Sequence, residues 1–227
     1  MKRNGFLSRA TRGWFFSLLS LSLFAPAIVR SEVNTNDIII NEVLAINNTI
    51  APLAAFPDFF PDYVELYNPT ASDIDLGALG YALSTKRNPS PVDPEAFYYF
   101  PAGTKVPADG YLLVFMDNNT NFPGIHATFN LGGTNQVTLN MSGDGDEVLL
   151  CKDIGGIGVP PFYTQVDACL FGMQVPELAV GRVPEHTGDF TLIYPSPCGG
   201  PGATIECFPN TAYTNFGNPT TLKINEW

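Results

Sequence analysis

Short runs of apolar residues alternate with clusters of Gly, Pro, Asn and Asp along most of the chain. Beyond the N-terminal region, no segment keeps the 3.6-residue spacing of apolar positions that marks an amphipathic helix. Turn-forming clusters on both sides of each run instead predict β-strands. The predicted strands are Asp37–Ala45, Tyr63–Tyr67, Tyr81–Ser84, Phe97–Phe100, Gly110–Met116, Ala127–Leu131, Gln136–Asn140, Glu147–Lys152, Thr164–Phe171 and Phe190–Tyr194. Many short strands at this spacing predict an all-β fold, a sandwich or a barrel.

Alternation of side chains within the first two predicted strands assigns residues to faces. Successive residues of a strand point to opposite sides of the sheet. Val64 and Leu66 are therefore expected to point into the core. In the strand before them, strict alternation puts Ile40, Glu42 and Leu44 on one face, which places Glu42 among apolar neighbours.

The first 31 residues have a different pattern, with basic residues and no acidic ones. The apolar run Trp14–Phe24 follows the basic start, and small residues follow at Ala25–Ala27, which is the order of a secretory signal peptide. The uncharged stretch 14–29 has 16 residues, fewer than the roughly 20 of a spanning helix. We expect residues 1–31 to be a signal peptide, cut after Ala27 or after Ser31, with no membrane span in the mature chain. A retained anchor is the alternative.

Charge and composition limit the possible partners. Removal of residues 1–31 leaves 6 basic residues against 22 acidic ones, a formal charge of −16. Nucleic-acid binding depends on Lys and Arg side chains that displace counterions from phosphates, so nucleic acid is not an expected partner. With 45% hydrophobic and 15% charged residues, the chain has enough apolar surface to fold. We expect a secreted or cell-surface protein with one folded domain over residues 32–207.

All four cysteines lie in the predicted mature chain. An exported protein meets oxidising conditions, so we expect disulfides. Three pairings are possible. We prefer Cys151–Cys169 with Cys198–Cys207, since each pair brackets a turn-rich segment. A zinc site would need a C-x₂₋₄-C spacing, which the sequence lacks.

A series of motifs, in a fixed order over residues 37–202, resembles the lamin tail domain family in the form found in bacterial secreted and surface proteins. The most distinctive is Asp62–Pro69, with the sequence DYVELYNP. Gly80–Ser84 resembles the family's Gly-Trp-x-Leu-Ser strand, although Tyr81 stands at the Trp position, and Phe100–Val114 resembles its Phe-Pro-x-Gly-Thr hairpin. Residues of this sequence that match the family's motifs are Asn41, Glu42, Asp62, Glu65, Leu66, Asn68 and Arg182.

The resemblance implies an immunoglobulin-like β-sandwich that is an accessory module without catalytic function or cofactor. Its expected partners are other proteins, the cell surface and neighbouring domains of the same polypeptide. Residues 208–222 have the composition of a linker. Ile224–Trp227 (INEW) repeats the pattern of Ile40–Val43 (INEV), so residues 223–227 are interpreted as the start of a following domain.

Two carboxylates raise an alternative function. Glu42 and Glu65 have the residue type of the carboxylate pair of a secreted glycoside hydrolase. We favour a structural role, in which each carboxylate accepts hydrogen bonds from local backbone donors in the sandwich. Arg182 is expected to bind backbone carbonyls or a strand carboxylate. The two histidines, His126 and His186, come without the G-x-S-x-G element of a serine hydrolase.

An acidic turn and an aromatic loop complete the candidates. Asp144, Asp146 and Glu147 suggest a calcium-dependent adhesion domain, but an EF-hand would need Glu where Gly155 stands. A turn rich in Gly and Asp also explains this segment.

The insertion Asn47–Pro61 contains Phe56, Phe59 and Phe60. These phenylalanines either plug one end of the sandwich or form an apolar contact surface. They are the candidate contact residues.

Overall fold

A computed structural model describes residues 37–85, 97–117, 119–127, 146–155, 162–172, 174–198 and 209–214. The chain divides into the units Met1–Glu32 and Val33–Trp227, and every described residue belongs to the second. The predicted signal peptide and the predicted start of a following domain lie outside the described residues. Within the described ranges, no helix has the length and apolar character needed to cross a membrane.

The described residues form β-strands and connecting turns, as the sequence predicts. The strands are β1 (Ile39–Leu44), β2 (Tyr63–Asn68), β3 (Ile74–Asp75), β4 (Tyr81–Ser84), β5 (Tyr98–Tyr99), β6 (Lys105–Val106), β7 (Gly110–Phe115), β8 (Ile125–His126), β9 (Asp146–Asp153), β10 (Tyr163–Phe171), β11 (Ala179–Val183) and β12 (Asp189–Ile193). The strand predicted over residues 136–140 falls outside the described residues.

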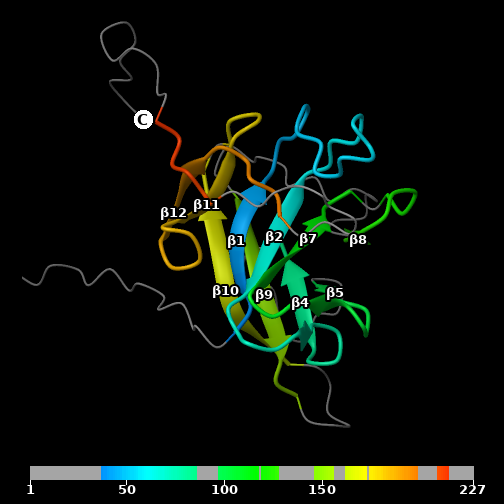
Figure 1. Ribbon diagram of the computed structural model, residues 1–227. Helices are drawn as coiled ribbons and strands as arrows, with labels where there is room; N and C mark the ends of the chain where they lie inside the picture. Colours follow the sequence, from blue (N-terminus) through cyan, green and yellow to red (C-terminus); the bar gives the residue numbers. More distant parts are fainter. Residues whose placement is uncertain are drawn as a thin grey trace, which may run out of the picture. The chain divides into compact units, whose positions relative to one another are not determined.

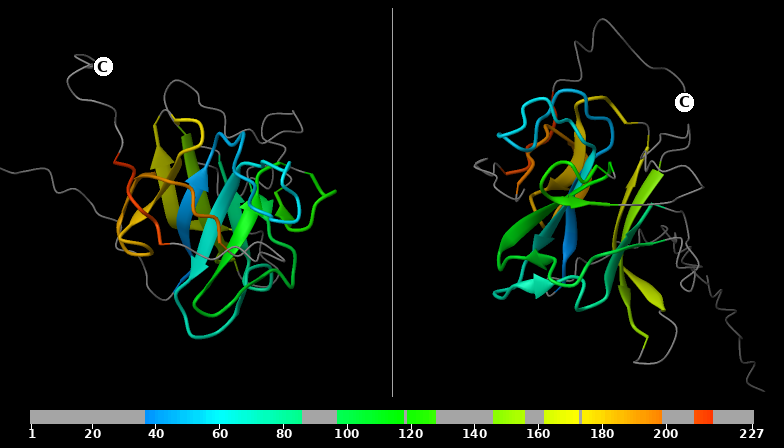
Figure 2. Two further views of the ribbon diagram at one scale, coloured as in Figure 1. Left: turned by 45° about the horizontal axis from the view of Figure 1, so that its top comes forward. Right: turned by 90° about the vertical axis from the view of Figure 1, so that its right-hand side faces the viewer.

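Two sheets form the layers of the fold (Figure 1). One has six strands in the order β12-β11-β1-β2-β7-β8, and the other has four in the order β10-β9-β4-β5. Neighbouring strands are antiparallel except β7 and β8, which are parallel. The right-hand view of Figure 2 shows the two sheets face to face. This is the immunoglobulin-like β-sandwich that the sequence predicts.

The main hydrophobic core lies between the sheets. Its buried side chains include Ile38, Ile40, Val43, Val64, Leu66, Leu112 and Val114 from the six-stranded side, and Tyr81, Leu83, Val148, Leu150, Cys169 and Phe171 from the four-stranded side. Val64 and Leu66 point into this core, which confirms the alternation predicted for β2. At about 25 cal/mol per Å² of buried apolar surface, such a core is the main source of stability.

A β-bulge in β1 changes which residues face the core. The register with β2 shifts between Ile40 and Glu42, so Asn41 is an inserted residue. Ile40 and Val43 face the main core, whereas Leu44 belongs to a cluster on the opposite face of the sheet. The expectation that Ile40, Glu42 and Leu44 share one face is therefore wrong, because the bulge reverses the alternation.

The outer face of the six-stranded sheet is also covered, by a second hydrophobic cluster. Its buried members are Leu44, Leu53, Phe59, Tyr63, Leu113, Phe115, Ala179 and Ile193. Both faces of β1 and β2 are consequently buried along their whole length.

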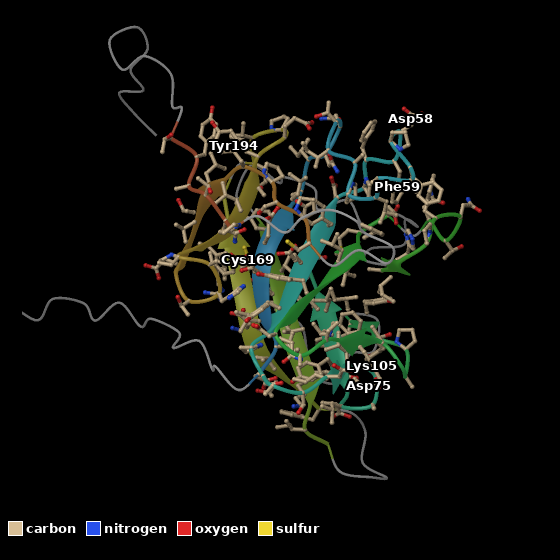
Figure 3. All side chains as sticks on the ribbon, in the orientation of Figure 1. Asp58, Phe59, Asp75, Lys105, Cys169 and Tyr194 are labelled. Carbon is tan, nitrogen blue, oxygen red and sulfur yellow. The ribbon has the colours of Figure 1, made fainter. Side chains whose placement is uncertain are left out.

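The aromatic insertion supplies part of this cover. The ring of Phe59 stacks on Phe122 with centroids 4.0 Å apart and meets Phe115 edge-on at 5.3 Å. Phe56 packs edge-on against Phe122, and Phe60 is half-buried. Figure 3 shows Phe59 at the end of the molecule opposite Asp75 and Lys105. The loop therefore plugs the fold, and the prediction that these phenylalanines form a contact surface is wrong for the buried Phe59.

Cys151 and Cys169 are not joined to each other. Cys169 points into the main core, while Cys151 lies in a separate cluster on the other face of the four-stranded sheet. Both thiols are free. The predicted Cys151–Cys169 disulfide is wrong, because side chains on opposite faces of one sheet cannot reach each other. Cys207 lies outside the described residues, so the Cys198–Cys207 disulfide stays a prediction.

Part of the predicted linker belongs to the sandwich. Ala212 forms an antiparallel bridge with Ile193 at the end of β12, and the Tyr213 amide donates to the Leu192 carbonyl at 2.8 Å. Asn210 is buried. The linker prediction is therefore wrong for residues 209–214, and the rest of it lies outside the described residues.

Candidate functional site

Two glutamates face each other on the outer side of the six-stranded sheet. Glu42 of β1 is the direct cross-strand neighbour of Glu65 in β2, and both side chains are 0% exposed. The bulge in β1 brings this about, since it turns Glu42 away from the main core and toward the face that carries Glu65. The site is therefore a pair of carboxyl groups enclosed in the fold.

A segment after β12 covers the pair. We call residues 194–198 the strap. The Ser196 amide donates to both oxygens of Glu42, at 3.1 and 3.2 Å, and the Cys198 amide donates to Glu65. The two glutamates therefore accept hydrogen bonds from backbone donors, as expected. The donors lie 154 and 133 residues away in sequence, so the expectation that they are local is wrong.

Side chains occupy the remaining positions around the two carboxyl groups. The Tyr63 hydroxyl donates to Glu42, and Asn41 Nδ2 donates to Glu65 Oε1 at 2.8 Å. Ser196 Oγ lies 2.8 Å from Glu42 Oε2. Every carboxyl oxygen of the pair thus has a protein partner, and the closed site has the geometry of a structural network.

Burial sets the proton affinity of these groups. It raises the pKa of Glu42 to about 7, against the opposing effect of hydrogen bonds from Tyr63 and Ser196. It raises the pKa of Glu65 well above its usual range, and the charge of Glu42 adds to the effect. In the described part of the chain, no Lys or Arg side chain is hydrogen-bonded to either group. A buried pair without a cation favours the protonated form.

Gly181 leaves the space in which the segment after residue 208 approaches the sheet. A Cβ at this position would meet Ile193 Cδ1 and lie 2.9 Å from Asn210 Nδ2. We expect Gly181→Ala to lower the free energy of unfolding by about 1–3 kcal/mol through overpacking, measured by urea denaturation. The control is Gly172→Ala, where a Cβ has no neighbour within 4 Å. Equal stability of the two variants would contradict this prediction.

Arg182 joins the two sheets, as the sequence predicts for a structural arginine. Its Nη2 lies 2.8 and 2.9 Å from the two oxygens of Asp167 in β10. Its Nε donates to the Ile40 carbonyl at 2.9 Å, and the Ile40 amide donates to Asp167 at 2.8 Å. The bulge in β1 leaves the amide and the carbonyl of Ile40 without partners in the neighbouring strand. The buried Arg182–Asp167 pair supplies a hydrogen-bond partner to each of them.

The two histidines lie in separate clusters. His126 Nδ1 is 2.6 Å from Asp117 Oδ1 and packs near Phe59. His186 stacks on Tyr67 with ring centroids 3.5 Å apart.

A hydroxyl links His186 to a carboxylate. The Tyr111 hydroxyl donates to Glu185 at 2.8 Å and lies 2.7 Å from His186 Nε2. Burial lowers the pKa of His186. No serine is hydrogen-bonded to either histidine among the described residues, so neither cluster has the parts of a catalytic triad.

Another family-motif carboxyl group, Asp62, supports the aromatic insertion. It accepts a hydrogen bond from the Asn47 amide at 2.9 Å. Burial raises its pKa to about 7, and the charges of Asp117 and Glu177 act in the same direction. Asn68, also in the motif, donates to the carbonyls of Ser72 and Pro107 at 2.8 and 2.9 Å and so fixes the turn after β2.

The candidate calcium residues are placed only in part. Asp144 and the Asp146 side chain lie outside the described residues, and Glu147 is buried in β9. Among the residues that the structure describes, no group of three or more His, Cys, Asp or Glu side chains is arranged to hold a metal ion.

Sequence reasoning missed the residues that complete the network. Ser196 and Asn210 lie in segments without apolar alternation, so the hydrophobic pattern gives them no role. Asp167 was placed in a strand, but its pairing with Arg182 depends on how the two sheets pack.

The family model described as Lamin Tail Domain matches residues 31–163, which is more than half of the 227 residues. No curated protein matches the chain.

Proposed function

The chain belongs to the lamin tail domain family, and from this we propose that it is a non-catalytic extracellular module that acts by contact with other proteins. The family's domain is an immunoglobulin-like sandwich, and such folds carry many functions, so the function of this chain depends on the residues at its surface. The enclosed state of Glu42 and Glu65 supports a role other than hydrolysis, since a substrate needs access to a carboxylate pair.

The observation that carries this proposal is a group of exposed apolar side chains at one end of the four-stranded sheet. We call Leu79, Tyr99, Ile154 and Phe162 the end patch. Their exposed fractions are 49%, 39%, 62% and 47%. Large apolar side chains gathered on a surface mark sites of protein contact.

Backbone contacts hold the members of the end patch near one another. The Ile154 amide donates to the Phe162 carbonyl at 2.9 Å, and the Asp153 amide donates to the carbonyl of Gly80, next to Leu79, at 2.9 Å. The ring of Tyr99 lies 5.5 Å from Tyr163, which follows Phe162. In the right-hand view of Figure 2, the β9–β10 pair reaches below the other strands.

The net negative charge of the chain restricts the kind of protein that it can bind. The whole chain has a formal charge of −11 and a pI near 4.4. An acidic surface slows association with other acidic surfaces and speeds it with neutral or basic ones. The proposed partner is therefore a protein with an apolar contact region and a neutral or basic rim, including a neighbouring domain of the same polypeptide.

Site-specific photo-crosslinking in cells that export the full-length protein tests this function. A photoreactive residue at Ile154 is expected to give a discrete protein adduct that Phe162→Ser abolishes. The matched control is the same residue at Leu170, which is equally exposed at 62% but lies toward the other end of β10. Equal adducts at both positions, or none at Ile154, would refute the end patch as a contact surface.

A further inference from the structure

Ser196 Oγ lies between two oxygen atoms, and its single proton cannot serve both. It is 2.8 Å from Glu42 Oε2 and 2.8 Å from Asn210 Oδ1. Both are hydrogen-bond distances. A hydroxyl has one donor and can also accept. One of the two neighbouring groups must therefore donate to Ser196 for both contacts to be hydrogen bonds.

The orientation of the Asn210 amide decides which group donates. Its Nδ2 donates to the carbonyl oxygens of Arg182 and Asn41 at 3.1 and 3.3 Å. These two acceptors fix the nitrogen side of the amide, so the oxygen side faces Ser196. For both contacts to be hydrogen bonds, Ser196 must donate to Asn210, and a protonated Glu42 must donate to Ser196.

We propose that a proton on Glu42 latches the strap to the sheet through the relay Glu42 Oε2–H to Ser196 Oγ–H to Asn210 Oδ1. The relay joins three segments that are distant in sequence: β1, the strap and residues 209–214. Loss of the proton removes one of its two hydrogen bonds, and it leaves a charged Glu42 opposite Glu65 beneath the strap. The strap then opens, because water must reach the charged Glu42.

In the part of the chain that the structure describes, the groups around the pair offer no replacement for this proton. Tyr63 and Glu65 face Glu42 from β2, and Glu185 acts on it from the turn after β11. Tyr111 of β7 and His186 belong to the cluster around Glu185. The strap contributes two backbone amides, Ser196 Oγ and the Cys198 thiol, which acts on Tyr63.

The described groups that contact this face are therefore negatively charged or neutral, apart from His186 when it is protonated. Among the described residues, the guanidinium of Arg182 is bound to Asp167. The pKa of Glu42, about 7, places the opening between neutral and mildly basic pH.

Amide hydrogen exchange on the full chain at pH 6 and pH 8.5 tests the latch. Protection factors, which correct for the intrinsic pH dependence of exchange, are compared for Ser196 and Cys198 in the strap. Val43 and Val64, in the core strands, report global unfolding. We expect protection in the strap to fall at least tenfold at pH 8.5 while the core strands remain protected.

Two variants separate the latch from other effects. Glu42→Gln keeps an uncharged donor toward Ser196, so its strap should stay protected at pH 8.5. Asp62→Asn is the matched control, since it removes another buried carboxyl group with a pKa of about 7 and should retain the wild-type loss. Strap protection that is equal at both pH values in the wild type, or lost equally in Glu42→Gln, would overturn the proposal.

A direct measurement covers the case in which Glu42→Gln fails to fold. The carboxyl ¹³C shift of Glu42 in the wild-type chain is expected to be that of the acid form at pH 6. It should move to that of the carboxylate over the same pH range in which the strap loses protection. A carboxylate shift at pH 6 would refute the protonated relay.

Discussion

Arg182→Met is expected to lower the free energy of unfolding by about 3–5 kcal/mol, because it leaves the charge of Asp167 without its partner inside the fold. The two side chains are only 7% and 8% exposed. The substitution also removes the donor to the Ile40 carbonyl and the contact of the guanidinium with the Phe190 ring, 4.2 Å from its centroid. Urea denaturation monitored by circular dichroism measures the change.

A second cation provides the control for this prediction. Lys152 lies 3.2 Å from the Tyr81 hydroxyl and 4.6 Å from the ring centroid, but it is only half-buried. Lys152→Met should cost about 1 kcal/mol or less, as expected for a partly exposed cation on an aromatic ring. If Arg182→Met were as mild as Lys152→Met, the buried ion pair would not have the structural importance assigned to it.

Stability is expected to decrease as the pH rises from 5.5 to 8.5. Burial raises the pKa of Glu42 and of Asp62 to about 7 in the folded chain, above their ordinary values of 4.5 and 3.8. The folded state therefore retains protons that the unfolded chain releases. Each group then loses about 2 kcal/mol of stabilisation between pH 5.5 and 8.5, at 1.36 kcal/mol per pKa unit.

His186 acts in the opposite direction at lower pH. Its pKa is lowered by burial, so the unfolded chain binds a proton below about pH 6.5 that the folded chain does not. Maximal stability should therefore lie in mildly acidic solution. Urea denaturation at five or six pH values measures the curve. In Asp62→Asn, the free energy of unfolding should fall by about 2 kcal/mol less between pH 5.5 and 8.5 than in the wild type. A free energy of unfolding that rises over this range would contradict the raised pKa values.

The alternation of apolar residues predicts the layers of this fold well, because the main core follows period-2 rules in β2, β4 and β7. It fails in β1, where Asn41 is inserted and the faces exchange. It also cannot reveal that the outer face of β1 and β2 is covered. Tyr63 and Glu65 alternate with the core-facing Val64 and Leu66, yet they too are buried, by segments from elsewhere in the chain.

The candidate site was predicted only in part, for a related reason. The family motif identified Glu42, Glu65 and Arg182, and residue chemistry suggested their structural role. Their partners Ser196, Asn210 and Asp167 come from segments far away in sequence, so the network depends on tertiary packing. The sequence-based disulfide Cys151–Cys169 failed in the same way, since spacing along the chain does not tell which face of a sheet a cysteine occupies.

The placement of β1 and β12 in one sheet determines how the domain responds to a pulling force. Both strands are antiparallel to β11, so they run parallel to each other, and the start of β1 and the end of β12 lie at opposite ends of the sheet. Tension between these two points pulls β1 and β12 past β11 in opposite directions. The hydrogen bonds between these strands are then loaded together and do not open one at a time. The four-stranded sheet lies outside this path.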